Sequence, residues 1–544
     1  MAVRALPLLL LSACYCLLSS FAAAQDTLVD LGYAKYHGQA FSNGISRWLG
    51  IRYAAPPVGD LRFAAPQDPV ASGKTVNATQ HGPVCISTST YPTPSDMSED
   101  CLFLDVYAPS NAKKSSEKLP VYFFIQGGGF NALSNANYNG AGLLQASNLS
   151  IVIVTFNYRV GPYGFLAAKE IEEGASLNNG LKDQIKALQW VQKYISKFGG
   201  DPNHVVIGGP SAGGGSVTLL LSAYGGRDDG LFHAAVAESQ SFAGMFDVEG
   251  SQFAYDNLVD RTGCTDSKDT LACLRKLDTN SLQKQNIMTP FPGAKIAPLY
   301  MYGPTVDNDL VPDYTYALFE QGRFIKVPVI FGDDTNEGTI FVPKSTSSIE
   351  DADTFIQAQF PKIRSSELST INSIYMGPNS TRDFPDSGAY WPPASTAYGE
   401  IRYICPGIYL SDIYAKHGVP SWNYHYAVED PSSQESGYGV THTVEVNAIW
   451  GPQYVSGAPP ASYTTSNAPI VPVMQGYWTS FIRSFDPNPH RAAGSPMWTT
   501  WTEGLLSYQR IFIRTGDTKM ETVYKAQRER CSYLTSIGLD LKQK

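Results

Sequence analysis

The chain has 544 residues, a formal net charge of −9 at pH 7, and charged side chains at 16% of its positions. A hydrophobic content of 43%, with 48 Gly and 36 Pro residues, excludes a disordered, collagen-like or coiled-coil chain. The acidic balance argues against a nucleic-acid partner, because neutralising phosphates requires clustered Lys and Arg. We therefore expect a globular protein with a large core.

Residues 1–24 are typical of a secretory signal peptide. Arg4 provides a positive charge, Leu6 to Leu18 form a mostly apolar core, and three alanines precede Gln25. This core is shorter than the roughly 20 residues of a membrane span, and no later segment reaches about 18 uninterrupted apolar residues. We expect cleavage after residue 24, a secreted protein without a membrane anchor, and a single domain over residues 25–544.

Six cysteines follow the predicted cleavage site, an even number that indicates disulfides in an oxidising compartment. No CxxC spacing typical of zinc ligands occurs, so no metal site is expected. Adjacency favours the pairs Cys85–Cys101 and Cys264–Cys273, which leaves Cys405–Cys531. In a secreted chain, the glycosylation acceptors would be Asn77, Asn148 and Asn379.

From residue 119 onwards, short apolar runs alternate with segments of helical periodicity. The predicted buried strands are 119–125, 151–156 and 205–207, and the predicted helices are 179–198 and 212–221. This order predicts an α/β fold with a mostly parallel sheet covered by helices on both faces. The less periodic segments 250–325 and 343–420 are expected to be helical and loop insertions around a site.

The segment Gly209-Pro-Ser-Ala-Gly213 lies between a predicted strand and a predicted helix. A G-x-S-x-G sequence in this context is typical of a nucleophile elbow, in which a strained turn exposes the Oγ of the serine, here Ser211. A glycine-rich turn without catalytic function is the alternative interpretation. The helix that follows would favour negative charge developing at its N-terminus.

Three glycines, Gly127 to Gly129, follow the first predicted strand. Lipases and esterases use such a segment to direct backbone N–H groups at the oxyanion of the reaction. We expect Gly128, Gly129 and Ala212 to supply these donors. A flexible turn is the alternative, and it is less favoured beside a nucleophile elbow.

A hydrolase of this kind needs an acid and then a histidine downstream of its serine. Of the histidines at 417, 425, 442 and 490, His442 lies on a loop beyond a predicted strand, which suits a general base. After the predicted strand 327–331, Asp333, Asp334 and Glu337 compete as the acid. The residues alone leave that choice open.

Two long motifs resemble those of type-B carboxylesterases, the α/β-hydrolase family that includes cholinesterases and secreted fungal esterases and lipases. One is Phe198 to Gly213, around the serine, and the other is Glu99 to Pro109, around a disulfide cysteine. Shorter matches are 49–63, 157–166 and 484–488. The resemblance extends from about residue 27 to 535 and is closest to secreted fungal carboxylesterases.

The resemblance implies roles for individual residues. Ser211 would be the nucleophile, Glu337, in Asn-Glu-Gly, the acid, and His442 the base. The same cysteine pairing is implied, as are a buried serine near the base at Ser239 and a structural ion pair between Arg62 and Glu99. No cofactor or metal is implied, and the partner is a small ester substrate.

Departures from the family bear on the substrate. The 15 residues between Cys85 and Cys101 include neither the tryptophan that stacks on choline in cholinesterases nor a long amphipathic lid. A quaternary ammonium needs an aromatic cage, and Ile340 takes the place of one of two cholinesterase aromatics, with Phe341 after it. We therefore expect hydrolysis of soluble short- to medium-chain esters. The alternatives are a triacylglycerol or sterol-ester lipase with a reduced lid, and a non-catalytic binding protein.

Overall fold

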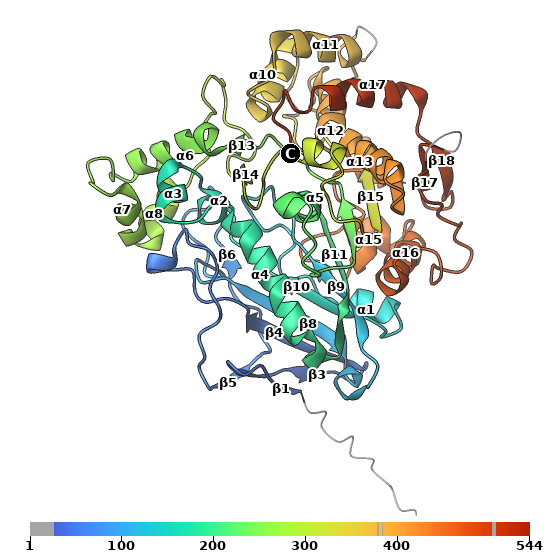
Figure 1. Ribbon diagram of the computed structural model, residues 1–544. Helices are drawn as coiled ribbons and strands as arrows, with labels where there is room; N and C mark the ends of the chain where they lie inside the picture. Colours follow the sequence, from blue (N-terminus) through green and yellow to red (C-terminus); the bar gives the residue numbers. More distant parts are fainter. Residues whose placement is uncertain (1–26, 378–379, 383, 503–506) are drawn as a thin grey trace, which may run out of the picture.

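The computed structural model describes residues 27–377, 380–382, 384–502 and 507–544 (Figure 1). The predicted signal peptide at 1–24 and the acceptor Asn379 lie outside these residues. Within them, an eleven-stranded sheet runs through the centre of the molecule. Along the sheet the strands are β18 (Lys519–Thr522), β17 (Gln509–Ile513), β16 (Ser421–Tyr426), β15 (Val329–Asp334), β12 (Ala234–Glu238), β11 (Gly200–Pro210), β9 (Leu119–Phe124), β10 (Val152–Phe156), β8 (Phe103–Pro109), β4 (Ile45–Arg52) and β3 (Gln39–Ala40).

The strands from β17 to β10 pair in parallel, and antiparallel strands extend the sheet at both edges. The mostly parallel sheet that the sequence predicts is confirmed. The strand predicted at 205–207 is part of the longer β11, whose register shifts between Gly200 and Val205. Smaller sheets pair β1 (Leu28–Asp30), β2 (Lys35–His37) and β5 (Thr75–Asn77), β6 (Val84–Cys85) with β7 (Met97–Ser98), and β13 (Phe246–Asp247) with β14 (Thr305–Val306).

Helices cover both faces of the sheet (Figure 1). They are α1 (Ala141–Ala146), α2 (Gly161–Phe165), α3 (Lys169–Gly174), α4 (Asn179–Tyr194), α5 (Ala212–Ser222), α6 (Val248–Arg261), α7 (Thr270–Lys276), α8 (Thr279–Gln285), α9 (Thr315–Glu320), α10 (Ile349–Gln359), α11 (Ser365–Tyr375), α12 (Trp391–Gly399), α13 (Cys405–Lys416), α14 (Pro431–Glu435), α15 (Val446–Trp450), α16 (Ile470–Ser484) and α17 (Lys525–Ser536). The helices predicted at 179–198 and 212–221 correspond to α4 and α5. The two predicted insertions contain α6 to α9 and α10 to α13.

The pleat of β9 shows how the sheet separates two cores. Val121 and Phe123 pack into the core that contains α4 and α5, whereas Tyr122 and Phe124 pack into the core of α1, α15 and α16. Because successive side chains of a strand point to opposite faces, a strand buried on both sides must be apolar throughout. This is why the central strands appear in the sequence as continuous apolar runs.

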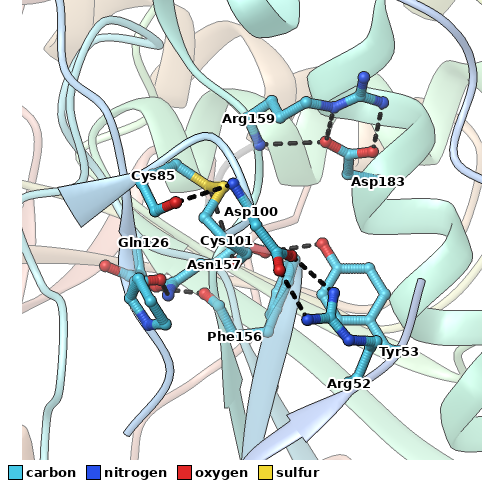
Figure 2. Close-up of a disulfide and its surroundings, with 12 residues drawn as sticks. Arg52, Tyr53, Cys85, Asp100, Cys101, Gln126, Phe156, Asn157, Arg159 and Asp183 are labelled. Carbon is cyan, nitrogen blue, oxygen red and sulfur yellow. Dashed lines mark hydrogen bonds and ion pairs between the residues drawn. A yellow bond between two sulfur atoms is a disulfide. The ribbon is translucent and has the colours of Figure 1, made fainter. Parts of the chain in front are cut away.

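The three disulfides join the predicted pairs, Cys85–Cys101, Cys264–Cys273 and Cys405–Cys531. Figure 2 shows the first of them beside the ion pair of Arg52 with Asp100, whose Nη1 and Oδ1 atoms are 2.6 Å apart.

Arg62 also pairs with Glu99, which precedes this disulfide: Nε and Nη2 donate to the two carboxylate oxygens at 2.8 and 2.6 Å. Both side chains are buried, as the resemblance implies. This part of the chain is therefore fixed to the body of the molecule.

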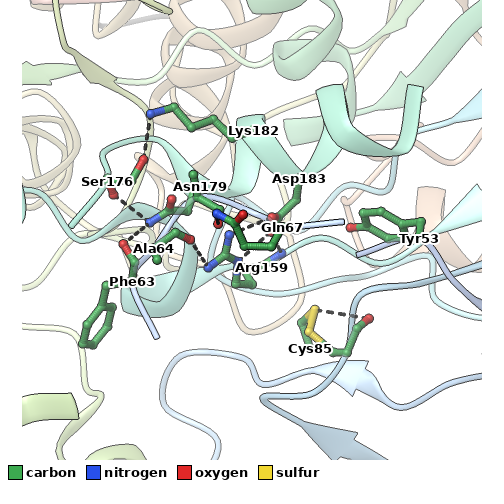
Figure 3. A network of polar contacts seen from close by, with 12 residues as sticks. Tyr53, Phe63, Ala64, Gln67, Cys85, Arg159, Ser176, Asn179, Lys182 and Asp183 are labelled. Atoms are coloured by element: carbon green, nitrogen blue, oxygen red, sulfur yellow. Dashed lines mark hydrogen bonds and ion pairs between the residues drawn. A yellow bond between two sulfur atoms is a disulfide. The ribbon is translucent and has the colours of Figure 1, made fainter. Parts of the chain in front are cut away.

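A second buried network joins the segment after β10 to α4 (Figure 3). Arg159 donates through Nε and Nη2 to the carboxylate of Asp183, each at 2.8 Å, and through Nη1 to the carbonyl of Ala64. Burial raises the pKa of Asp183, and the adjacent guanidinium opposes that shift. Asn179 donates to the carbonyl of Phe63. Segments far apart in the sequence are thus tied together.

Candidate functional site

Ser211 lies in the sharp turn between β11 and α5. Its φ of +59° and ψ of −120° are strained for a residue with a side chain. A Cβ on Gly209 or Gly213 would lie 2.0 or 2.1 Å from the carbonyl oxygen of Ile125. Glycine is therefore required on both sides of the serine, because β9 passes too close for any side chain. This contact explains the spacing of the G-x-S-x-G motif.

The glycine loop lies against the serine turn. A Cβ on Gly127 would be 3.2 Å from the Cβ of Ser211, and the Gly127 amide donates to Oδ1 of Asn135 at 2.9 Å. Gly128 and Gly129 have φ angles of +117° and +63°, which suit glycine. Within the described chain, the amides of these two glycines donate to no other group. They are thus available to a ligand at the loop.

Glu337 follows β15 and is fully held by hydrogen bonds. Its Oε1 accepts from the Oγ of Ser239 at 2.7 Å and from the amide of Asp334 at 2.8 Å. Its Oε2 contacts Nδ1 of His442. The carboxylate is buried, so the position of its two oxygens is fixed relative to the imidazole.

His442 is brought to Glu337 by the loop that precedes it. Asn336 pairs with Thr441 in an isolated parallel bridge, and the side chain of Asn336 accepts from the amide of Val440 at 2.9 Å. The imidazole is 7% exposed and packs between the rings of Tyr403 and Phe341, with centroids 4.3 and 5.0 Å away.

With Nδ1 on Glu337, the Nε2 atom of His442 is the ring nitrogen left for another partner. It is buried, and no group in the described parts of the chain, Ser211 included, is placed to hydrogen-bond to it.

The other candidate acids, Asp333 and Asp334, are the last two residues of β15 and have partners other than His442. Asp333 accepts from Nε2 of Gln240 at 2.9 Å, and Asp334 lies beside Glu445. Burial, with the charges of neighbouring carboxylates, raises the pKa of Asp333 and Asp334 well above the ordinary value. Neither is hydrogen-bonded to His442 among the described contacts.

The other candidate bases are engaged elsewhere. His425 contacts Glu521 at 2.9 Å, and the ring of His417 packs on Phe324. The amide of His490 donates to the Oγ of Ser480. Of the downstream histidines, the structure thus places His442 against the acid that the family resemblance selects.

The sequence analysis did not identify two buried carboxyl groups near the site, those of Glu238 and Glu445. Glu238, at the end of β12, accepts from Nε1 of Trp478 at 2.8 Å, and its carbonyl accepts from the amide of Ser211. Burial and the charge of Glu445 raise the pKa of Glu238 to about 8. These acids come from separate strands and loops, so no spacing in the sequence links them.

Over residues 27–377, 380–382, 384–502 and 507–544, no group of three or more His, Cys, Asp and Glu side chains is arranged to hold a metal. Across the same ranges, no helix is both long and apolar enough to cross a membrane.

Comparison with known proteins identifies the family. Residues 25–532 match the carboxylesterase family. The crystal structure of Aspergillus niger EstA aligns with a TM-score of 0.91 at 43% identity, covering 95% of this chain and 99% of its own. Secreted lipase 4 of Gibberella zeae is 30% identical over 498 residues, which cover 88% of this chain and 86% of that protein. Neuroligin-3 of Mus musculus is 28% identical over 501 residues, which cover 82% of this chain and 59% of that protein. The chain therefore belongs to the carboxylesterase family, and it is a carboxylic-ester hydrolase with an α/β-hydrolase fold.

Proposed function

We propose that the chain is a serine esterase that works through Ser211, His442 and Glu337. The observation that carries this proposal is the contact between Nδ1 of His442 and the buried Glu337, at the same sheet edge as the strained Ser211 turn. A base oriented by an acid, near a partly accessible serine, is the arrangement that activates a hydroxyl for attack.

The reaction proceeds in two steps. Nε2 of His442 takes the proton of Ser211 as Oγ attacks the ester carbonyl, and Glu337 stabilises the imidazolium that forms. The proton then passes to the leaving alcohol, and water repeats the attack on the acyl-enzyme. The hydrogen bond between serine and histidine is often long in free enzymes and shortens when substrate binds.

Backbone amides would hold the tetrahedral oxyanion. Gly128 and Gly129 present N–H groups without partners in the described chain, and Ala212 begins α5. One such donor is typically worth about 3–4 kcal/mol of barrier. The positive φ angles of Gly128 and Gly129, which glycine adopts readily, are consistent with this use.

We further propose soluble short- to medium-chain esters as substrates. The loop between Cys85 and Cys101 is held in place: Nε2 of Gln283 donates to the carbonyls of Ser87 and Thr90, and the amide of Thr88 donates to the carbonyl of Asn131. Tyr91 is the large hydrophobic side chain that this loop exposes. A lid that opens onto oil would need a larger apolar face.

Secretion is part of the same proposal. We place a signal peptide at residues 1–24 and treat residues 25–544 as one domain. The three disulfides support an oxidising compartment, and one relative is named a secreted lipase.

The test is hydrolysis of p-nitrophenyl esters from C2 to C16 by the wild type, Ser211→Ala and Ser216→Ala. We expect a maximum at C2–C6 and a loss of about 10⁴-fold or more in kcat for Ser211→Ala. Ser216 lies in α5, and its Oγ accepts a hydrogen bond from Nε2 of Gln184. Ser216→Ala serves as the control and is expected to keep at least a third of the activity. A Ser211→Ala variant with a tenth of wild-type activity would contradict the triad. A maximum beyond C10, with a rate jump at the solubility limit, would show a lipase instead, as several relatives are named.

A further inference from the structure

A small cavity lies beside the glycine loop, which contributes Gly129 to its lining. It has a free volume of about 40 Å³ and is lined by Gly129, Phe130 and Tyr300 together with aromatic residues of the first insertion. A volume of this size holds roughly three water-sized groups, which is the size of a carboxylate. Because Gly129 also belongs to the proposed oxyanion loop, a group in this cavity is close to a bound ester.

Two buried basic side chains line the cavity. Arg402 is 4% exposed and Lys544 is 1% exposed. Among the described residues that line the cavity, these are the basic side chains, and no Asp or Glu side chain is present. A buried polar or charged group is costly unless it is paired, so a guanidinium and an amine without a hydrogen-bond partner in a cavity without Asp or Glu point to an anion that enters the cavity.

Arg402 is held in position by neutral partners. Its Nε donates to Oγ of Ser241 at 3.0 Å and its Nη1 donates to the hydroxyl of Tyr398 at 2.9 Å. Its guanidinium carbon lies 5.4 Å from the ring centre of Tyr300, whose ring closely covers Gly129. Arg402 belongs to a π-helical turn, η5 (Glu400–Ile404), a feature often found at functional sites.

Lys544 reaches the cavity because the last residues run back into the molecule, near β13 and β14 and above α5 (Figure 1). The amide and carbonyl of Lys544 bond to Ala243 and Tyr316, and Gln543 forms a bridge with Gly244.

The side chain of Lys544 has no such partners. Its Nζ lies 4.3 Å from the ring centre of Phe130 and beside Gly215, whose amide bonds to the carbonyl of Ser211. No described group hydrogen-bonds to this Nζ. The Nζ atom thus lies beside the first turn of α5, which follows the nucleophile, and it has no hydrogen-bond partner among the described residues.

Resting on the proposed ester hydrolysis, we infer that Arg402 and Lys544 form a subsite for a carboxylate of the substrate, so that the enzyme prefers esters carrying a negative charge. Arg402 supplies a fixed guanidinium that bonds carboxylates well. Lys544 supplies a second cation against an aromatic face, a favourable position for a charged amine.

Binding of a carboxylate at this subsite should change the protonation of Lys544. Burial lowers the pKa of Lys544 well below its ordinary value, and the charge of Arg402 adds to that shift. The other titratable groups that line the cavity, Tyr300 and Tyr302, have raised pKa values through burial and stay neutral. A carboxylate favours the protonated amine, so its binding is accompanied by proton uptake at Lys544.

The kinetic test compares matched esters. Monoethyl succinate and ethyl butanoate differ by a carboxylate on the acyl side, and acetylsalicylate and phenyl acetate differ by one on the alcohol side. In at least one pair, we expect Lys544→Met to lower kcat/KM for the anionic ester at least tenfold more than for the neutral ester. Lys542→Met removes the same charge two residues away and is expected to change that ratio less than twofold. Equal ratios in the wild type and Lys544→Met for both pairs would overturn the subsite while leaving the esterase proposal intact.

A binding test is independent of catalysis. Titration calorimetry of the wild type with benzoate and benzamide, in two buffers of different ionisation enthalpy, is expected to show at least tenfold tighter benzoate binding with proton uptake. Both features should be lost in Lys544→Met and in Lys544→Gln, a second variant in case one folds poorly. Equal affinity for benzoate and benzamide in the wild type would overturn the inference, even if every ester assay failed.

Discussion

At the scale of single residues, the site depends on the close approach of two backbones. Ser211 has a backbone conformation that few residues with side chains adopt, and the flanking glycines leave room for the carbonyl of Ile125. The strain is maintained because β11 and α5 are buried on both sides of the turn. Filling that space with a side chain should therefore lower both the stability of the fold and the activity.

We expect Gly213→Ala to destabilise the fold by about 1–3 kcal/mol and to lower kcat at least tenfold, because the new Cβ must displace the Ile125 carbonyl. Gly377→Ala is the control, since a Cβ there meets no atom within 4 Å. Urea unfolding and p-nitrophenyl acetate turnover measure the two effects. A Gly213→Ala variant with wild-type stability would show that the turn has room for a side chain.

The buried Glu238 should make the stability pH-dependent. Its pKa in the folded protein is about 8, against 4.5 ordinarily, so the folded state holds this proton more tightly than the unfolded state. The associated stability is fully present below about pH 4.5 and is lost as the pH rises through about 8, with a slope of up to roughly 1.4 kcal/mol per pH unit.

Glu238→Gln cannot ionise, so its stability should fall less than that of the wild type between pH 5 and pH 8.5. Urea unfolding midpoints across this range, with the exposed Glu117→Gln as the control, measure the difference. Parallel curves for the wild type and Glu238→Gln would show that Glu238 is not protonated in the folded protein.

At the scale of elements, α17 is attached to the fold by a disulfide and an ion pair. Cys531 bonds to Cys405 at the start of α13, and Arg530 donates to both oxygens of the buried Glu400 at 2.7 and 2.6 Å. Arg402 lies between Glu400 and Cys405 in the sequence. The position of one cation of the proposed subsite thus depends on how α17 is held.

Loop length predicts different contributions from two of the disulfides. Cys405–Cys531 closes 126 residues and Cys264–Cys273 closes 9. Chain entropy gives about 5 kcal/mol for the long loop and about 2.5 kcal/mol for the short one. Replacing both cysteines of the long loop by Ala should therefore cost roughly 2 kcal/mol more than the same change in the short loop, as judged by denaturant unfolding. Equal losses would contradict the entropic account.

At the scale of the whole molecule, the sheet gathers distant residues at one edge. Ser211 follows β11, Ser239 follows β12 and Glu337 follows β15, and these three strands are neighbours in parallel register. Parallel strands end at the same edge, which is where α/β proteins bind their ligands. His442 joins them through a loop bridged to Asn336.

The proposed secretion predicts a processed and glycosylated product. Asn77 and Asn148 are both exposed, which makes them accessible to a glycosyltransferase. Expressed in a eukaryotic secretory host, the protein should begin at Gln25 and lose mass on glycosidase treatment, with Asn77→Gln and Asn148→Gln each removing part of that loss. N-terminal sequencing and intact mass provide the measurements. A secreted product that retains residues 1–24 would contradict the signal peptide.

The sequence by itself determined the parts of this protein that depend on local chemistry. Central strands buried on both faces must be continuously apolar, so β9, β10 and β15 could be recognised in the sequence as apolar runs. Glycine is required on both sides of Ser211 because the carbonyl of Ile125, directly after β9, lies so close, and this contact explains the spacing of the motif. The cysteine pairs were predictable because two of them are near neighbours.

Only the tertiary structure shows which of several residues with similar local sequence lie together. Asp333 and Asp334 end β15 and Glu337 follows it; the residues alone left the three open, the family resemblance selected Glu337, and the bridge between Asn336 and Thr441 shows how His442 comes to contact it. Arg402 and Lys544 are 142 positions apart and belong to no shared motif. They line one cavity because the last residues fold back beside Gly244, a long-range contact that no periodicity in the sequence encodes.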